Sequence, residues 1–283
     1  LLIYTIHAGN GLPNISETLH NIQPKLTSVI GPPGWWPLFS LIILTSVAPF
    51  AMPQLIQKFY AIRDRKSVRI GMIASTFFAF LIGVIAYFMG STTRFFLDPE
   101  TTPRAFLESG KPNVDALMPE MLTKVIPESL SVIILLLILS ASMSTLAALV
   151  LISSSSVIKD FYAGVINKNT SDQKLTLLMR WTSAIFIFLS MIIAFMKPDT
   201  IVAILGISWG AIGAAFLGPF IWGLFWKKAN KYGALFSSIA GLLTCLILYF
   251  TGMASPQAGT IGMGVSLVVN PMVSLITVNS NQD

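Results

Sequence analysis

One apolar stretch of the chain is rich in hydroxyl side chains, whose neutral oxygens could bind a cation: Ser140-Ala141-Ser142-Met143-Ser144-Thr145. Residues three and four positions apart share a helix face, so the Ala141 carbonyl is expected near the hydroxyls of Ser144 and Thr145. Three such oxygens supply half or more of the shell of an alkali cation, which prefers hard oxygen ligands. The motif alone favours a second interpretation, in which small residues pack against a neighbouring helix and the hydroxyls bond back to their own carbonyls.

Two prolines, Pro49 and Pro53, interrupt an earlier apolar stretch. Pro49 removes the helical hydrogen bond to the carbonyl of Thr45, and its ring pushes that carbonyl aside. In lipid, backbone groups freed in this way persist only where they are buried in protein or line a cavity. The pattern fits a discontinuous helix beside a bound solute, and it also fits an ordinary proline kink.

A glycine-rich stretch, Gly206-Ile207-Ser208-Trp209-Gly210-Ala211-Ile212-Gly213, is followed by Gly218-Pro219. Small residues let two helices approach closely, so this stretch predicts helix packing. Trp209 lies far from both ends of its apolar run and is a candidate to line a cavity. No ionisable group lies deep in any apolar run, which argues against proton relays, voltage sensors and charged filters.

The composition places these residues in membrane-spanning helices. The chain has 283 residues, of which 54% are hydrophobic and only 11% are charged, whereas a soluble domain carries about 25% charged residues. Apolar runs of about 20 residues recur, which is the length of a membrane span. We therefore expect an all-α, polytopic helical membrane protein with a single transmembrane domain. The expected spans are 35–57, 70–92, 129–157, 179–196, 200–226, 234–251 and 261–278, preceded by a truncated span at 1–8.

Charge alternates between successive connections. Basic residues predominate in 58–69, in 158–178 and at 227–231, whereas acidic residues predominate in 93–128. The positive-inside rule then places 93–128 on the outer side, as an external loop. Within it, Val114–Val125 is expected to form a short amphipathic helix that acts as a lid or only covers helix ends. Because topology explains the basic balance, no nucleic-acid partner is expected.

Catalytic and metal-binding side chains are sparse. Cys245 is the single cysteine, and His7 and His20 stand without carboxylate or thiolate neighbours in the sequence. An intramembrane enzyme needs paired groups such as Ser–His or Asp–Asp within its spans, and a channel needs a re-entrant filter; neither pattern is visible. We expect no enzyme activity and no resident cofactor.

Three stretches resemble the sodium:solute symporter family, which includes sodium/proline, pantothenate, monocarboxylate, sialic-acid and sodium/glucose transporters. They are Pro53–Ile62 with its basic loop, Leu139–Leu146 running on to Tyr162, and Gly213–Lys228. The resemblance implies a leucine-transporter-like fold of two inverted five-helix repeats. This chain would hold the second repeat with peripheral helices, and the first core helix would belong to a missing amino-terminal half of the same protein.

By this resemblance, 35–57 is similar to the sixth core helix, unwound beside the solute, and 129–157 to the eighth, which contributes to a sodium site. The implied sodium ligands are Ala141, Ser144 and Thr145. The implied solute contacts are Thr45, Ala48, Pro49, Phe50 and Gln54, with Trp209 lining the cavity.

The function implied is sodium-coupled symport of a small organic solute across the cell membrane by alternating access. The solute is expected to be an amino acid such as proline, or a small carboxylate, with Na+ as the coupling ion and the lipid bilayer as surroundings. Two alternatives remain open: a transporter-like sensor domain of a signalling protein, and an ion channel subunit.

Overall fold

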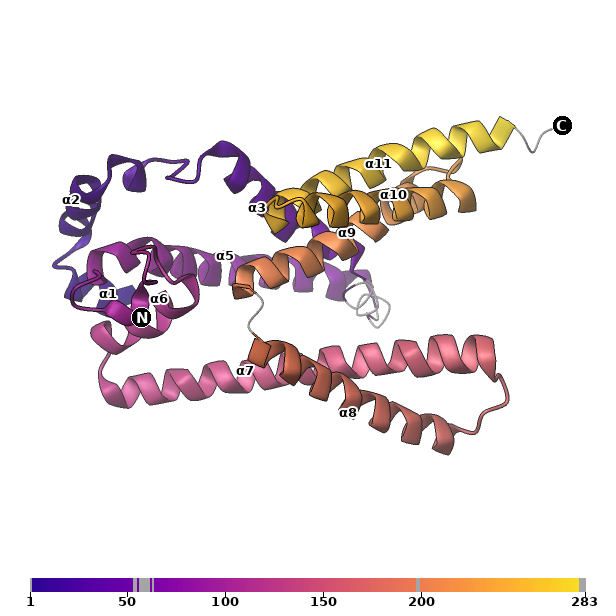
Figure 1. Cartoon of the computed structure of the whole chain (residues 1–283), viewed down its shortest axis with the longest axis horizontal. Helices are drawn as coiled ribbons and strands as arrows, with labels where there is room; N and C mark the ends of the chain where they lie inside the picture. Colours follow the sequence, from indigo (N-terminus) through magenta and orange to yellow (C-terminus); the bar gives the residue numbers. More distant parts are fainter. Residues whose placement is uncertain (1, 53–54, 56–61, 63, 197–198, 280–283) are drawn as a thin grey trace. The chain divides into compact units, whose positions relative to one another are not determined.

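The computed structural model describes residues 2–52, 55, 62, 64–196 and 199–279. Within these residues the expected all-α fold is confirmed, because the one β pairing is an isolated bridge between Phe106 and Pro112. Figure 1 shows the helices in chain order. They are α1 (Leu2–Ala8), α2 (Leu12–Ile22), η1 (Pro24–Thr27), α3 (Trp35–Val47), η2 (Ala48–Ala51), α5 (Arg65–Phe96), η3 (Pro103–Ala105), α6 (Val114–Val125), α7 (Glu128–Ser155), η4 (Ser156–Ile166), α8 (Asp172–Met196), α9 (Ile201–Phe225), α10 (Lys231–Phe250) and α11 (Ser255–Asn279).

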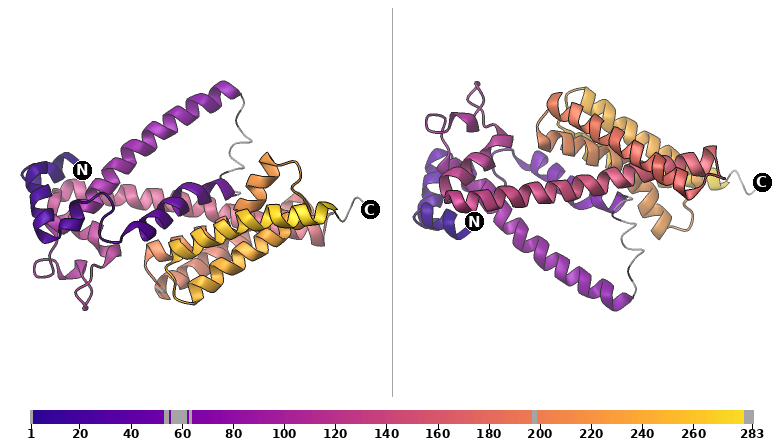
Figure 2. Two further views of the ribbon diagram at one scale, coloured as in Figure 1. Left: turned by 90° about the horizontal axis from the view of Figure 1, so that it is seen from above. Right: turned by 90° about the horizontal axis from the view of Figure 1, so that it is seen from below.

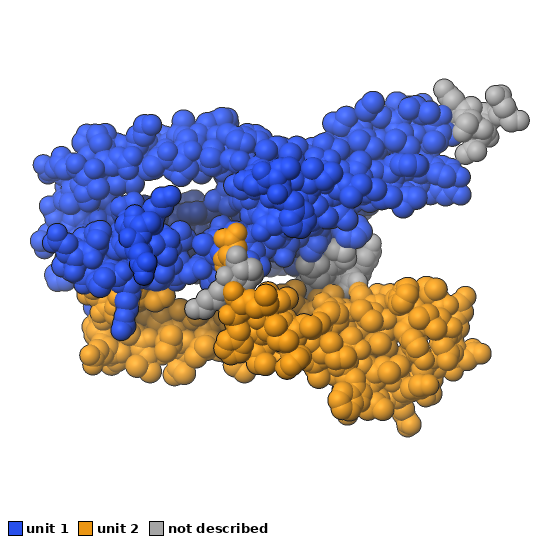
Figure 3. Space-filling view, in the orientation of Figure 1, with its two compact units in different colours: residues 1–117, 200–283 blue, residues 118–199 orange. Residues whose placement is uncertain are grey.

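The chain divides into two compact units (Figure 3). Unit 1 comprises Leu1–Leu117 and Thr200–Asp283, and unit 2 comprises Met118–Asp199. The candidate solute residues that the structure describes therefore lie in unit 1, and the candidate sodium ligands lie in unit 2.

Six helices in the described part of the chain are long and apolar enough to cross a membrane: α5, α7 continued by η4, α8, α9, α10 and α11. Trp35–Ala51 is also apolar but shorter. The predicted span 35–57 continues past it into residues 53–54 and 56–57, which lie outside the described residues.

Helices α9, α10 and α11 pack together as a bundle in unit 1, side by side in both views of Figure 2. Their backbones touch at glycines: a Cβ added to Gly210 would lie 2.8 Å from the Cα of Gly259, and one added to Gly262 would lie 2.8 Å from the carbonyl oxygen of Gly241. The packing interpretation of the glycine-rich stretch in α9 is thereby confirmed, because Gly206, Gly210 and Gly213 are all buried.

Polar side chains fix the register of this bundle. Gly218 N donates to Ser266 Oγ (3.3 Å), and Asn270 Nδ2 donates to the buried Ser237 Oγ (3.2 Å). Trp222 Nε1 donates to the carbonyl of Leu267 at 2.7 Å. The hydrocarbon core of a bilayer offers no hydrogen-bond partners, so each of these interhelical hydrogen bonds favours one alignment of the helices along their axes.

Unit 1 also carries the loop that precedes α6. Asp64 caps the start of α5: its Oδ1 accepts from Ser67 N at 2.7 Å, and this hydrogen bond lowers the pKa of the Asp64 carboxyl. The short helix expected at 114–125 is confirmed with the same bounds, and its Met121 and Val125 are buried.

Unit 2 is built from the part of α6 that follows Leu117 and from α7, η4 and α8. Ser183 Oγ of α8 donates to Ser154 Oγ of α7 at 3.0 Å. Beyond Ser155 the helix continues as a π-helix to Ile166, with Asn167 N donating to the carbonyl of Tyr162 at 2.8 Å. The connection expected at 158–178 is therefore much shorter in the structure, because a helix does not end where its apolar run ends. Lys159 and Asp160 lie within this continuation.

Candidate functional site

The predicted interruption at Pro49 is present in unit 1. The α-helix α3 ends at Val47, and Ala48–Ala51 form a single 3₁₀ turn closed by Met52 N donating to the carbonyl of Pro49 at 3.2 Å. Met52 is extended, with φ −83° and ψ 112°. The missing N–H of Pro49 explains the change, because an α-helix cannot bond through that position.

Helix α9 packs directly against this break. Ala48, Ala51 and Met52 form one buried cluster with α9, α10 and α11, and Trp209 packs against it while remaining half-buried. A Cβ added to Gly213 would lie 3.2 Å from the Cβ of Ala48. The structure thus brings together Ala48 and Trp209, two of the predicted solute residues, around one apolar cluster.

The remaining predicted solute residues differ in their surroundings. Phe50 is 62% exposed, Thr45 is exposed, and Pro49 is half-buried. Thr45 Oγ1 donates to the carbonyl of Leu41 at 2.8 Å. Gln54 lies outside the described residues. Thr45 and Phe50 are therefore the exposed side chains among the described solute residues at the break.

The predicted sodium ligands lie halfway along α7 in unit 2. Ala141, Ser144 and Thr145 are all exposed, and Thr145 Oγ1 donates to the carbonyl of Ala141 at 3.0 Å. That bond places a hydroxyl and a carbonyl oxygen side by side, and Ser144 adds a hydroxyl at the adjacent position. The hydrogen bond also satisfies the packing interpretation of Thr145, so both interpretations remain predictions.

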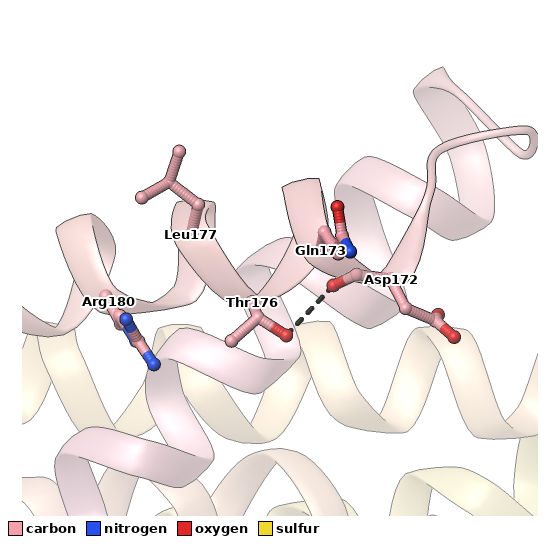
Figure 4. Close-up of a pocket in the computed structure, with 5 residues that line it drawn as sticks. All are labelled: Asp172, Gln173, Thr176, Leu177 and Arg180. Atoms are coloured by element: carbon pink, nitrogen blue, oxygen red, sulfur yellow. Dashed lines mark hydrogen bonds between the residues drawn. The ribbon is translucent and has the colours of Figure 1, made fainter.

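A depression on the surface of α8 is lined by Asp172, Gln173, Thr176, Leu177 and Arg180 (Figure 4). Thr176 Oγ1 donates to the carbonyl of Asp172 at 2.9 Å, so this hydroxyl is already engaged. All five residues belong to one helix, and sequence analysis predicted no role for them. In the part of the chain that the structure describes, no three His, Cys, Asp or Glu residues are grouped to hold a metal ion.

A polar contact between α6 and α9 is among those that sequence analysis did not predict. Both carboxylate oxygens of Asp115, in the first turn of α6, lie 3.3 Å from the backbone nitrogen of Ile201, the first residue of α9. An acidic residue near a helix start is the only signal of this contact in the sequence. The 86 residues between the partners leave no spacing rule that could pair them.

Comparison with known proteins agrees with these features. The family model of the sodium:solute symporter family matches residues 1–241. The chain is 29% identical to a sodium/pantothenate symporter of Haemophilus influenzae over 259 residues, covering 89% of this chain and 51% of that protein. It is also 29% identical to the high-affinity proline transporter PutP of Bacillus subtilis over 294 residues, covering 98% of this chain and 57% of that protein.

A shorter match has a higher identity: a sodium/proline symporter of Haemophilus influenzae is 37% identical over 112 residues, which is 40% of this chain and 22% of that protein. The chain thus spans about half the length of the first two relatives. The six apolar helices of the described residues and these relatives make it a multi-pass membrane protein. Because the family model covers most of its length, the chain belongs to the sodium:solute symporter family.

Proposed function

We propose that the protein to which this chain belongs is a sodium-coupled symporter of a small organic solute in the cell membrane. The observation that carries the proposal is the family match over residues 1–241. Two relatives are named for pantothenate and proline, so the solute class is an amino acid such as proline or a small carboxylate. The relatives described above are named as symporters or transporters and give no support to a sensor domain or a channel subunit.

In this proposal Na+ is the coupling ion, and it binds at α7. The Ala141 carbonyl and the Ser144 and Thr145 hydroxyls serve as ligands, supported by the 3.0 Å contact between Thr145 Oγ1 and the Ala141 oxygen. Neutral oxygens hold the ion weakly, which suits release on the side with little sodium. The ion favours one conformation only by binding it more tightly than the other, and that difference is the coupling free energy.

The solute in this proposal binds at the break between α3 and η2. Thr45 offers a hydroxyl and Phe50 an exposed ring, while Ala48 and Pro49 form the 3₁₀ turn that interrupts the helix there. Gln54 and Trp209 complete the proposed set. Further sodium and solute ligands come from the half of the protein outside this chain, in the inverted-repeat fold that the family resemblance implies. Transport by alternating access needs no catalytic residue and no resident cofactor.

Phe50→Ala should weaken the apparent affinity for the solute about ten- to hundredfold, because a Phe ring that covers a ligand contributes about 1.5–3 kcal/mol. Thr45→Val should weaken it by several-fold through loss of one hydroxyl. The measurement is the half-saturating solute concentration for uptake by the full-length protein, normalised to its amount in the membrane.

Phe78→Ala provides the matched control, since Phe78 is 64% exposed and Phe50 is 62% exposed. Phe78 lies on α5, away from the break, and its removal should leave the affinity unchanged. If Phe50→Ala and Thr45→Val both transport with the parent's affinity, the prolines mark only a kink.

A further inference from the structure

One carboxylate joins the loop helix α6 to the start of α9. Asp115 Oδ1 and Oδ2 both accept from the backbone N–H of Ile201 at 3.3 Å. The first N–H groups of a helix have no partner within the helix, and its positive end favours a negative charge. Thr200 caps the same turn, with its Oγ1 accepting from Ala203 N at 3.3 Å. The Asp115 contact therefore adds a cap from a distant segment to the local cap.

Asp115 is held in place by the loop before it. Asn113 N donates to the carbonyl of the fully buried Ala105 at 2.9 Å, and Leu117 N donates to the carbonyl of Asn113 at 3.1 Å. The start of α6 is thus tied to the loop 97–113 on both sides of Asp115. Because these hydrogen bonds hold the start of α6, the Asp115 carboxylate can set the position of the first turn of α9, to which it binds.

Helix α9 extends from the contact between Asp115 and Ile201 to the break at η2. Helix α9 begins at Ile201, and two turns later its Trp209 packs against the cluster that contains Ala48. A Cβ added to Gly213 would lie 3.2 Å from the Cβ of Ala48, so little space separates α9 from η2. Because a helix transmits displacement along its axis, a shift of its first turn is felt at η2.

We infer that Asp115 is a positioning residue for transport: its carboxylate fastens α6 to the first turn of α9, so that the outer loop helix and the helix packed against the solute break move together. The inference rests on the proposed function, and it assigns to Asp115 no contact with solute or ion. The predicted orientation places α6 and the start of α9 on the same, outer side of the membrane, as the contact requires.

Hydrogen exchange tests the contact without any solute. In the full-length protein, Asp115→Ala should speed exchange of the amides at the start of α9 about fivefold, because a helix N-terminus loses a charged partner. Glu120→Ala removes the same charge from the same helix but leaves the Asp115 carboxylate and its contact with Ile201 in place. Exchange at α9 should therefore stay at the parent's rate in Glu120→Ala. Equal exchange in the two variants overturns the inference.

Uptake kinetics test the positioning role. Asp115→Ala should lower the maximal uptake rate per molecule about fivefold, while the half-saturating sodium concentration changes by less than about twofold. Asp115→Glu, which keeps the carboxylate, should restore most of the rate. An unchanged rate in Asp115→Ala, or a rate that Asp115→Glu does not restore, contradicts the role. If the parent itself shows no sodium-dependent uptake, the proposed function and the transport role fail together, and the exchange result still decides whether the contact exists.

Discussion

Ser144→Ala and Thr145→Val should each raise the sodium concentration needed for half-maximal uptake about five- to hundredfold. Each change deletes one oxygen ligand without adding bulk, and loss of one such interaction costs about 1–3 kcal/mol. The cost is large for a site of neutral oxygens, because no charged group on α7 near Ala141 compensates for a missing ligand. Sodium-dependent uptake by the full-length protein measures this, and solute affinity at saturating sodium should change much less.

Ser142→Ala separates ligand loss from a general effect on α7. Ser142 is as exposed as its neighbours, and its Oγ donates to the carbonyl of Ile138 at 2.8 Å, just as Thr145 Oγ1 donates to Ala141. Its removal should leave the sodium dependence unaltered. If Ser142→Ala shifts the sodium dependence as much as Thr145→Val, or if none of the variants does, these hydroxyls belong to helix packing.

Gly262→Ala should destabilise the bundle of α9, α10 and α11 by about 1–3 kcal/mol, the usual cost of forcing extra volume into a tight core. The new Cβ would lie 2.8 Å from both the Gly241 oxygen and the Cys245 Cβ, and 2.9 Å from the Ala214 Cβ. These atoms belong to α9 and α10, so the three helices must separate to admit one methyl group. Thermal unfolding of the purified full-length protein measures the loss.

Gly264→Ala offers a control only two residues away on α11. No atom lies within 4 Å of a Cβ added there, so the variant should gain about 0.5–1 kcal/mol from its better helix propensity. The two variants should thus shift the unfolding temperature in opposite directions. A Gly262→Ala protein at least as stable as the Gly264→Ala protein would mean that these helices do not meet at Gly262.

Local sequence signals predicted local structure well in this chain. Pro49 sets the end of α3 because it lacks an N–H, and the glycines of α9 allow close packing because they lack a Cβ. The helix predicted at Val114–Val125 is observed with the same bounds, because its apolar residues recur with helical spacing. Each of these features depends on residues that are neighbours along the chain.

Features that depend on tertiary structure were not visible in the sequence. The prediction of Ala48 as a solute contact beside Thr45 and Phe50 came from its place in the chain, which does not reveal that its methyl group is buried against α9. The segment Ser156–Ile166 contains no proline, and its sequence does not reveal that α7 continues there as a π-helix. The partner of Asp115 could be found only once the chain was folded.

Solute uptake by the full-length protein in liposomes tests the central claim most directly. An inward sodium gradient should drive labelled proline or pantothenate, or a related small amino acid or carboxylate, to a concentration above that outside. Replacing external sodium with potassium at the same membrane potential should abolish this accumulation. Accumulation that is equal in sodium and potassium, or none of any solute of these classes in sodium, would contradict sodium-coupled symport.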